Sequence, residues 1–321
     1  MEAFDHYCEV EDWERASEIY TAQVESTNQP LRLQLFVGGN YQALIQISTR
    51  LSLEAALSTR IRCFLDLGNS YVCLGNQNIA IDNYQRALII AREVGDRQGE
   101  GNALGNLGLT YYSQGQYEQA IAYYQQHLTI AREIGDRRGE GNALGNLGLA
   151  YHAQGQYEQA IAHYQQRLTI AREIGDRQGE GNALGNLGNA YHAQGQYEQA
   201  IAHHQQYLTI AREIGDRQGE GIALVNWGET QIKLEHYPDA LENTIAALAI
   251  FREIGYRAGE AEALKNLAEL HQKLGEAEVA RGYCEQALAL ATELGIPLVE
   301  ECQQLWEALE KDVTRHKGAK D

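Results

Sequence analysis

Proline is scarce in this chain, and cysteine pairs and long apolar runs are missing altogether. Three prolines in 321 residues leave no room for proline-rich linkers. The five cysteines are scattered and form no CxxC pair, so they fit free thiols in a reducing compartment better than a disulfide framework. No apolar run approaches the roughly 18 residues of a membrane-spanning helix. These absences argue against a secreted disulfide-rich protein and against a membrane protein.

Positive charge is also in short supply. The formal net charge is −18, which argues against nucleic acid or an anionic membrane surface as the main partner. The opening segment "MEAFDHYCEVEDWERA" is acidic and lacks the apolar core of a signal peptide. We therefore expect a soluble protein located in the cytoplasm.

What the chain does contain is a repeat of 40 residues. Its third and fourth copies differ at only three positions, which indicates recent duplication. The six copies, called the first to sixth repeat below, start at Ile61, Gly101, Gly141, Gly181, Gly221 and Ala261.

Each repeat contains two helical patterns. In the second repeat, Leu104, Leu107 and Tyr111 form one apolar stripe, and a "QGQ" turn separates them from a second helical pattern that begins at Tyr117. Gly135 suits the end of that second helix, and the aspartate after it suits the start of the next one. A hairpin of this size cannot bury its apolar face alone, so the repeats are expected to stack into a solenoid.

The segment "NALGNLGLAYHAQGQYEQAIAHYQQRLTIA" resembles the tetratricopeptide repeat. The residues on its signature positions are Leu144, Leu147, Gly148, Tyr151, Ala160 and Tyr164. The resemblance implies an all-α fold, a right-handed superhelical solenoid of antiparallel helical hairpins. The proline that usually ends the second helix is replaced by Arg132, Arg172 and Arg212, so that helix is expected to run on, as in kinesin light chains and Pins/LGN adaptors.

Three regions follow from this pattern. Residues 1–60 contain "EDWERASEIY" and "GNYQALIQISTRL", which look like second helices of degenerate repeats and weakly resemble repeat-array segments of STAND-type signalling proteins. Residues 61–300 hold the six repeats. Residues 301–321 are expected to form a capping helix, followed by a short disordered tail, "RHKGAKD".

Catalytic and metal-binding motifs are not found. "GNALGN" lacks the Gly-Lys-Ser/Thr ending of a phosphate-binding loop, and no HExxH occurs. The histidines recur at 40-residue spacing, which duplication explains without a metal. "AREIGDRQGE" reads as a solvated face with ion pairs. We therefore expect no enzyme activity, no metal and no cofactor.

Asparagine and glycine recur on one side of the first helix. Counting from the start of each repeat, positions 2, 6, 9 and 13 form one stripe. Position 5 lies beside it, and position 12 carries an aromatic ring or imidazole in three repeats. In tetratricopeptide proteins these positions contact an extended peptide, so the resemblance assigns partner binding to Asn69, Asn102, Gly105, Asn106, Tyr112, Asn142, Gly145, Asn146, His152, Asn182, Gly185, Asn186, Asn189, His192, Asn226 and Asn266.

Two interpretations of the asparagines stay open. Their amides would form a ladder that pairs with a peptide backbone, or they would join neighbouring repeats and set the stacking angle. The glycines also divide: Gly148 is expected at a close contact between helices, and Gly145 on the floor of a binding groove. Lys265, with Glu269 nearby, does not match the basic clamp of chaperone-tail binders.

The predicted function is a non-catalytic adaptor or scaffold that binds an extended peptide of a protein partner. The alternative is a regulatory sensor array that modulates an NTPase or another enzyme on a separate chain. The sequence names neither the partner nor the oligomeric state.

Overall fold

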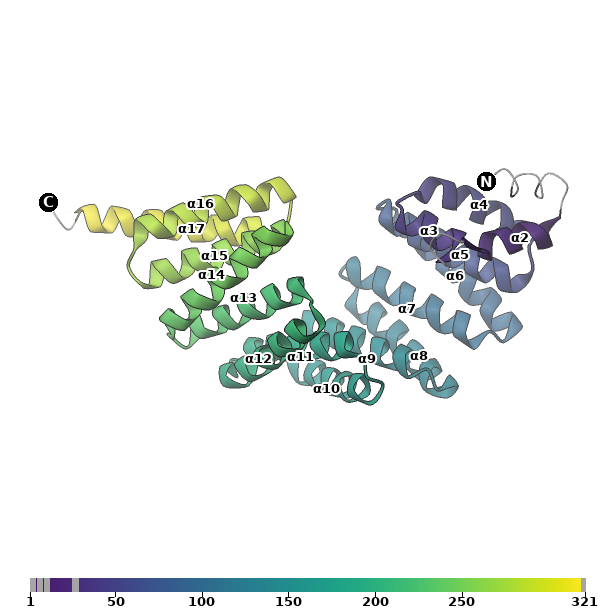
Figure 1. Ribbon diagram of the computed structural model, residues 1–321, viewed down its shortest axis with the longest axis horizontal. Coiled ribbons are helices and arrows are strands. Elements are labelled where there is room, and N and C mark those ends of the chain that lie inside the picture. The colour runs from purple at the N-terminus through teal and green to yellow at the C-terminus, as the bar shows by residue number, and fades with distance from the viewer. Residues whose placement is uncertain (1–3, 5–7, 9–11, 25–28, 319–321) are drawn as a thin grey trace. The chain divides into compact units, whose positions relative to one another are not determined.

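The computed structural model describes residues 4, 8, 12–24 and 29–318, and nearly all of them are helical (Figure 1). The elements are α2 (Trp13–Thr21), β1 (Gln23–Val24), β2 (Gln29–Pro30), α3 (Leu31–Val37), α4 (Tyr41–Glu54), α5 (Leu57–Cys73), α6 (Gln77–Val94), α7 (Arg97–Ser113), α8 (Tyr117–Ile134), α9 (Arg137–Ala153), α10 (Tyr157–Glu173), α11 (Arg177–Ala193), α12 (Tyr197–Ile214), α13 (Arg217–Lys233), α14 (Tyr237–Ile254), α15 (Arg257–Lys273), α16 (Ala277–Leu294) and α17 (Leu298–Gly318). The short antiparallel pairing of β1 with β2 does not alter the all-α class.

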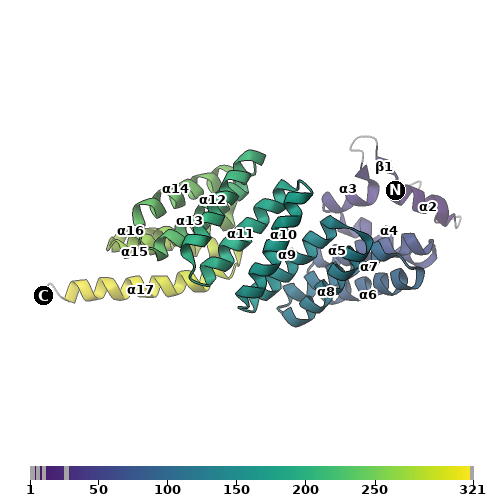
Figure 2. The ribbon, with the colours of Figure 1, turned by 90° about the horizontal axis from the view of Figure 1, so that it is seen from below.

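The chain divides into two compact units, Met1–Gln156 and Tyr157–Asp321, called the N-terminal and C-terminal unit below. Within each unit, consecutive helices pack as antiparallel hairpins, and the hairpins stack side by side (Figures 1 and 2). The predicted all-α solenoid of helical hairpins is confirmed.

Local signals set the limits of the helices. Asp136 caps the start of α9 by accepting a hydrogen bond from the Gly139 amide at 2.8 Å. Gly135 ends α8 with a φ of 71°, a left-handed conformation that glycine adopts without strain. Both caps were predicted from the sequence, and equivalent aspartates cap α7, α11 and α13.

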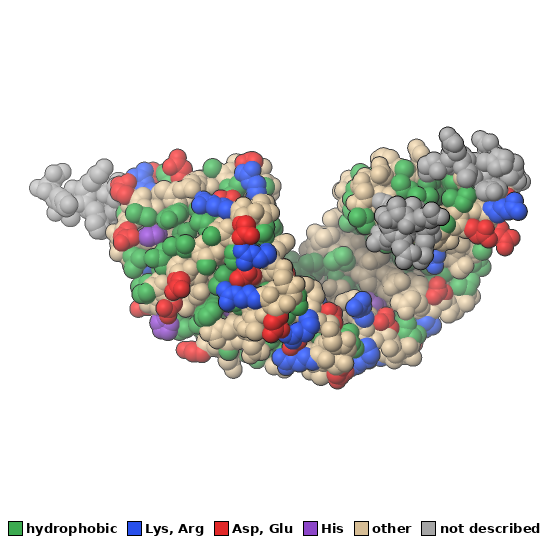
Figure 3. Space-filling model, viewed as in Figure 1, with side chains coloured by type: hydrophobic (Ala, Val, Ile, Leu, Met, Phe, Trp, Pro, Cys, Tyr) green, Lys and Arg blue, Asp and Glu red, His purple; other side chains and the backbone are tan. Residues whose placement is uncertain are grey.

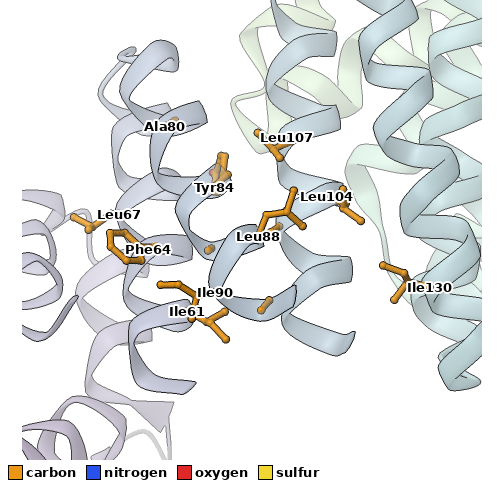
Figure 4. Close-up of a cluster of buried hydrophobic side chains, with 13 residues drawn as sticks. Ile61, Phe64, Leu67, Ala80, Tyr84, Leu88, Ile90, Leu104, Leu107 and Ile130 are labelled. Carbon is orange, nitrogen blue, oxygen red and sulfur yellow. The ribbon is translucent and has the colours of Figure 1, made fainter. Parts of the chain in front are cut away.

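The core follows the predicted apolar stripes. Leu104 and Leu107 of α7 are fully buried, and they share one cluster with Tyr84 and Leu88 of α6 (Figure 4). Gly108 lets the two helices of its hairpin approach, because a Cβ built there would lie 2.5 Å from the Tyr124 ring. This is the contact predicted for the equivalent Gly148.

An ionic ladder joins successive hairpins, and it differs from the solvated face expected from the sequence. The carboxylate of Glu140 is buried and accepts a hydrogen bond from Arg132 Nε at 2.8 Å and another from Arg137. Burial raises the pKa of Glu140, but the two arginines outweigh it and hold that pKa below its ordinary value. The arginine that replaces the usual proline therefore binds a buried carboxylate.

The ladder continues along the C-terminal unit, where Figure 3 shows alternating blue and red atoms over the helix ends. Arg177 contacts both Glu180 of its own repeat and Glu213 of the following second helix. The pair with Glu213 joins the two helices of one hairpin, and Arg212 of α12 with Glu220 of α13 joins that hairpin to the next.

The first helices of the chain pack onto α5 through a buried polar network. Asp66 of α5 accepts a hydrogen bond from the Tyr20 hydroxyl of α2, and Arg32 of α3 lies 3.2 Å from both of its oxygens. Ser48 of α4 contacts the same tyrosine hydroxyl at 3.0 Å. The two segments that were expected to be helices near the N-terminus are helical, and they form α2 and α4.

The C-terminal helix is longer than expected. α17 continues to Gly318, so the prediction of a disordered tail is wrong for residues 315–318, and residues 319–321 lie outside the described residues.

Candidate functional site

The stripe of the N-terminal unit forms a small pocket between the first two repeats. Its volume is about 180 Å³. The residues around it come from α3, α5, α6 and α7, and they are Phe36, Asn69, Val72, Cys73, Tyr84, Asn106, Leu109, Thr110 and Ser113. Most of them occupy stripe positions or lie next to one, so two successive first helices supply a single concave surface.

This pocket has a polar floor and an apolar rim. The Tyr84 hydroxyl donates to Asn69 Oδ1 at 2.7 Å, and Asn106 Nδ2 lies 3.4 Å from the same oxygen. Burial raises the pKa of Tyr84, so the hydroxyl stays a neutral donor. At the rim, Val72 and Leu109 remain 38% and 54% exposed, which leaves apolar surface for a partner.

The same amide pair recurs in the C-terminal unit. Asn226 Nδ2 donates to Asn189 Oδ1 at 2.9 Å. In both units, position 6 of one repeat therefore binds position 9 of the repeat before it. These bonds favour the interpretation in which the asparagines join neighbouring repeats, and they use part of the hydrogen-bonding capacity that a peptide ladder would need.

The assigned residues differ in exposure. Exposed residues are Asn102, Asn142 and Asn189; half-buried residues are Asn69, Gly105, Asn106, Tyr112, Asn146, His152, Asn182, Asn186, His192 and Asn226; buried residues are Gly145, Gly185 and Asn266. The exposed asparagines at position 2 lie at the start of the first helix, one turn before the amide pairs.

His192 belongs to a polar cluster on the stripe of the C-terminal unit. Its Nδ1 lies 2.9 Å from Thr230 Oγ1, and its Nε2 lies 3.8 Å from Glu229 Oε1. Burial lowers the pKa of His192 despite the nearby carboxylate, so the ring is neutral near pH 7. The ring also packs edge-on against Tyr197 at 5.4 Å, so only part of it faces a partner.

The space beside the glycines at position 5 differs from what was expected. A Cβ built on Gly105 would lie 3.1 Å from the His127 ring, and one built on Gly185 would lie 3.1 Å from the Tyr207 ring. These close neighbours argue against the groove-floor interpretation for the two glycines. Their missing side chains make room for position 27 on the second helix of the same hairpin, rather than for a partner.

The sequence contains a signal for this contact that is visible only when the six repeats are compared with one another. Wherever position 5 is glycine, position 27 is large, and wherever position 5 is larger, position 27 is alanine. The six pairs are Leu65 with Ala87, Gly105 with His127, Gly145 with Arg167, Gly185 with Tyr207, Val225 with Ala247, and Lys265 with Ala287. Complementary sizes at two positions indicate a packing contact.

In the described part of the chain, no three His, Cys, Asp or Glu side chains gather as metal ligands. Nor does any described helix combine the length and apolarity that crossing a membrane requires.

Comparison with protein families assigns the fold directly. A model described as tetratricopeptide repeat matches residues 60–133, 139–213 and 220–293, well over half of the chain. The chain belongs to the tetratricopeptide-repeat family. No curated protein matches the sequence.

Several solved structures share the fold. A signal-transduction ATPase of the STAND class from Pyrococcus horikoshii, which has a tetratricopeptide-repeat sensor, is 20% identical with a TM-score of 0.67, over 87% of this chain and 43% of that one. This chain therefore spans less than half of that protein's length. A Podospora anserina protein described as a kinesin light chain is 18% identical with a TM-score of 0.54, over 62% and 98% of the two chains.

A third structure, a Rap protein in complex with competence and sporulation factor, is 15% identical with a TM-score of 0.59, over 97% of this chain and 96% of that one. The resemblances to kinesin light chains and STAND proteins that the sequence suggested are thus found in structure as well. At these identities they establish the fold of the chain and nothing finer.

Proposed function

We propose that this tetratricopeptide-repeat protein is a non-catalytic interaction scaffold that binds an extended peptide segment of a partner along the first-helix stripe. The observation that carries the proposal is the pocket of the N-terminal unit. There, apolar Val72 and Leu109 stand exposed beside the hydrogen-bonded amide of Asn69. An apolar rim next to polar groups suits one side chain and the adjacent backbone of a bound chain.

The size of the pocket favours a peptide over a small molecule. Its volume of about 180 Å³ is below the roughly 300–1,000 Å³ of typical small-molecule sites. A space of this size takes one side chain. The similarity to a Rap protein that was solved in complex with a factor supports a binding role for an array of this length.

The test is a display selection with a random 12-residue peptide library against the purified full chain. Leu109→Gln should weaken the selected peptides about tenfold, because most of the benefit of burying one leucine is lost. Ile89→Gln is the matched control, since Ile89 lies on α6 away from the pocket and is 56% exposed, against 54% for Leu109. No enriched peptide, or equal losses in both variants, would refute the proposal.

The second candidate is a sensor array that acts on an effector NTPase or another enzyme on a separate chain. The similarity to an ATPase with a tetratricopeptide-repeat sensor favours it. Affinity purification distinguishes the two: a sensor brings down one catalytic partner in a fixed ratio, and the nucleotide turnover of that partner changes when the selected peptide is added. An adaptor brings down a partner whose activity the peptide leaves unchanged.

A further inference from the structure

Carboxylates surround a single lysine on the stripe of the C-terminal unit. Lys265 is 8% exposed, and its Nζ lies 3.0 Å from Glu301 Oε2 and 3.8 Å from Glu269 Oε1. Burial alone would lower the pKa of Lys265, but Glu269, Glu301 and Glu229 together raise it. Glu229 and Glu301 also act on Glu262. One ammonium group thus faces four carboxylates, and most of their charge is left uncompensated.

Part of this cluster is open to a partner. The side chains of Glu229 and Glu269 are 32% and 30% exposed. Burial and the charge of Glu229 raise the pKa of Glu262 by more than the charge of Lys265 lowers it. His192 on α11 supplies no second cation, because burial lowers its pKa. Lys233, at the end of α13, is exposed, and no ion pair joins these two described side chains, Lys233 and Glu229.

A second observation comes from Asn266, which lies between Glu262 and Glu269 on α15. It is 1% exposed, and neither its amide nitrogen nor its oxygen has a hydrogen-bond partner. Its equivalent Asn226 donates to the residue 37 positions earlier, and the residue 37 positions before Asn266 is Glu229. Asn266 therefore occupies the place next to Glu229 in the following repeat. A buried amide without a partner is costly, and a ligand that hydrogen-bonds to it removes the cost.

We propose that Glu229, Glu262, Asn266 and Glu269 form a subsite for an arginine side chain of the bound segment. A guanidinium group has five N–H donors in a planar fork, which can pair with carboxylates and an amide oxygen together. A metal ion is a poorer fit, because no described ligands converge as a metal site requires. The inference rests on the proposed function in one respect, that the partner is a peptide chain.

The test uses the full chain and a fluorescein-labelled ten-residue probe of alternating arginine and serine, with a glutamine–serine probe for comparison. The triple variant Glu229→Gln, Glu262→Gln, Glu269→Gln should weaken binding of the arginine probe at least tenfold in fluorescence anisotropy. Glu301 is left in place so that Lys265 keeps its closest partner.

The matched control removes the same charge elsewhere in the C-terminal unit. Glu198, Glu242 and Glu285 are exposed on second helices, and their replacement by glutamine should change the affinity less than twofold. Equal losses in the two triple variants would mean diffuse attraction to an acidic protein, and the subsite would be rejected. Equal binding of the arginine and glutamine probes would reject it too.

Asn266→Leu separates binding from packing. If the Asn266 amide binds the ligand, Asn266→Leu should raise the melting temperature of the free chain and weaken binding of the arginine probe several-fold. A lower melting temperature with unchanged affinity would make Asn266 a structural residue and overturn the proposal. Leu109→Gln should leave this probe unaffected, so failure of the pocket and failure of the arginine subsite are told apart.

Discussion

The two units follow the same 40-residue plan but fill position 24 of the second helix differently. In the N-terminal unit this position is Tyr84 and Tyr124, whose rings cover the glycine at position 8. In the C-terminal unit it begins as tyrosine and then becomes His204, Thr244 and Cys284. The hairpins still form, because the small residue at position 8 is kept. The 40-residue repeat therefore requires that the residues at positions 8 and 24 fit together, and it tolerates different residues at position 24.

The stripe changes over the same stretch. It presents neutral amides beside apolar Leu109 in the N-terminal unit, and it gains Glu229, Glu262 and Glu269 in the C-terminal unit. Because the stripe lies outside the core, its chemistry can change without cost to the hairpins. The difference between the units therefore bears on the partner more than on the fold.

The largest expected effect, which is reached at pH 5, concerns His204, which is fully buried with neither ring nitrogen hydrogen-bonded. His204→Tyr would supply a hydroxyl to Asn189, as Tyr84 does to Asn69. We expect a gain of about 1–2 kcal/mol in the free energy of unfolding at pH 7, measured by urea denaturation. Tyr84→His, the reverse change in the N-terminal unit, should lose a similar amount. A destabilised His204→Tyr would mean that the C-terminal hairpin has no space for the ring.

The effect of His204→Tyr should grow as the pH falls. Burial, with smaller contributions from His192 and His203, lowers the pKa of His204 to about 3, whereas an unfolded histidine titrates near pH 6.5. Below pH 6.5 the unfolded chain therefore binds a proton at His204 that the folded chain does not bind. As a result, His204 progressively lowers the free energy of unfolding as the pH falls. Between pH 7 and pH 5 the gap between the two proteins should widen by about 2 kcal/mol. A constant gap would show that His204 is protonated in the folded state.

The next prediction tests how closely the residue at position 24 packs against the glycine at position 8. Gly108→Ala should cost about 2 kcal/mol, because the new methyl group would lie 2.5 Å from the Tyr124 ring. Gly228→Ala should cost less, because the methyl group there meets the single Thr244 hydroxyl and the Ala240 carbonyl oxygen, 3.3 Å away, rather than an aromatic ring. Gly282→Ala, where nothing lies within 4 Å, is the control and should gain about 0.5–1 kcal/mol. Equal costs at Gly108 and Gly228 would remove the distinction between the units.

The smallest effect is the coupling between positions 5 and 27. Gly105→Val should destabilise the chain because its side chain enters the space of His127, and His127→Ala should relieve that cost. Val225 with Ala247 is the natural form of the double variant. A double-mutant cycle by urea denaturation should give a coupling of about 1 kcal/mol. Strict additivity would show that the size pattern across the six repeats has no energetic basis.

The sequence by itself determined the repeat, the hairpins, the caps and the limits of the helices within the repeats. These features rest on contacts three or four residues apart, or on the backbone freedom of a single glycine such as Gly135, so they can be read along the chain. For the same reason the contact of glycine at position 8 with the second helix was predictable, because the family signature places both residues.

Tertiary structure alone decided how the faces of the helices are used. Gly105 was expected to face a partner, but His127, 22 residues later, occupies its space. Asn226 was expected to bind a peptide, but its amide reaches Asn189 of the preceding repeat. Glu180 was expected in solvent, yet it is buried between two arginines. In each case the partner lies on another helix, and periodicity along one helix does not show which neighbouring side chain will fill a given space.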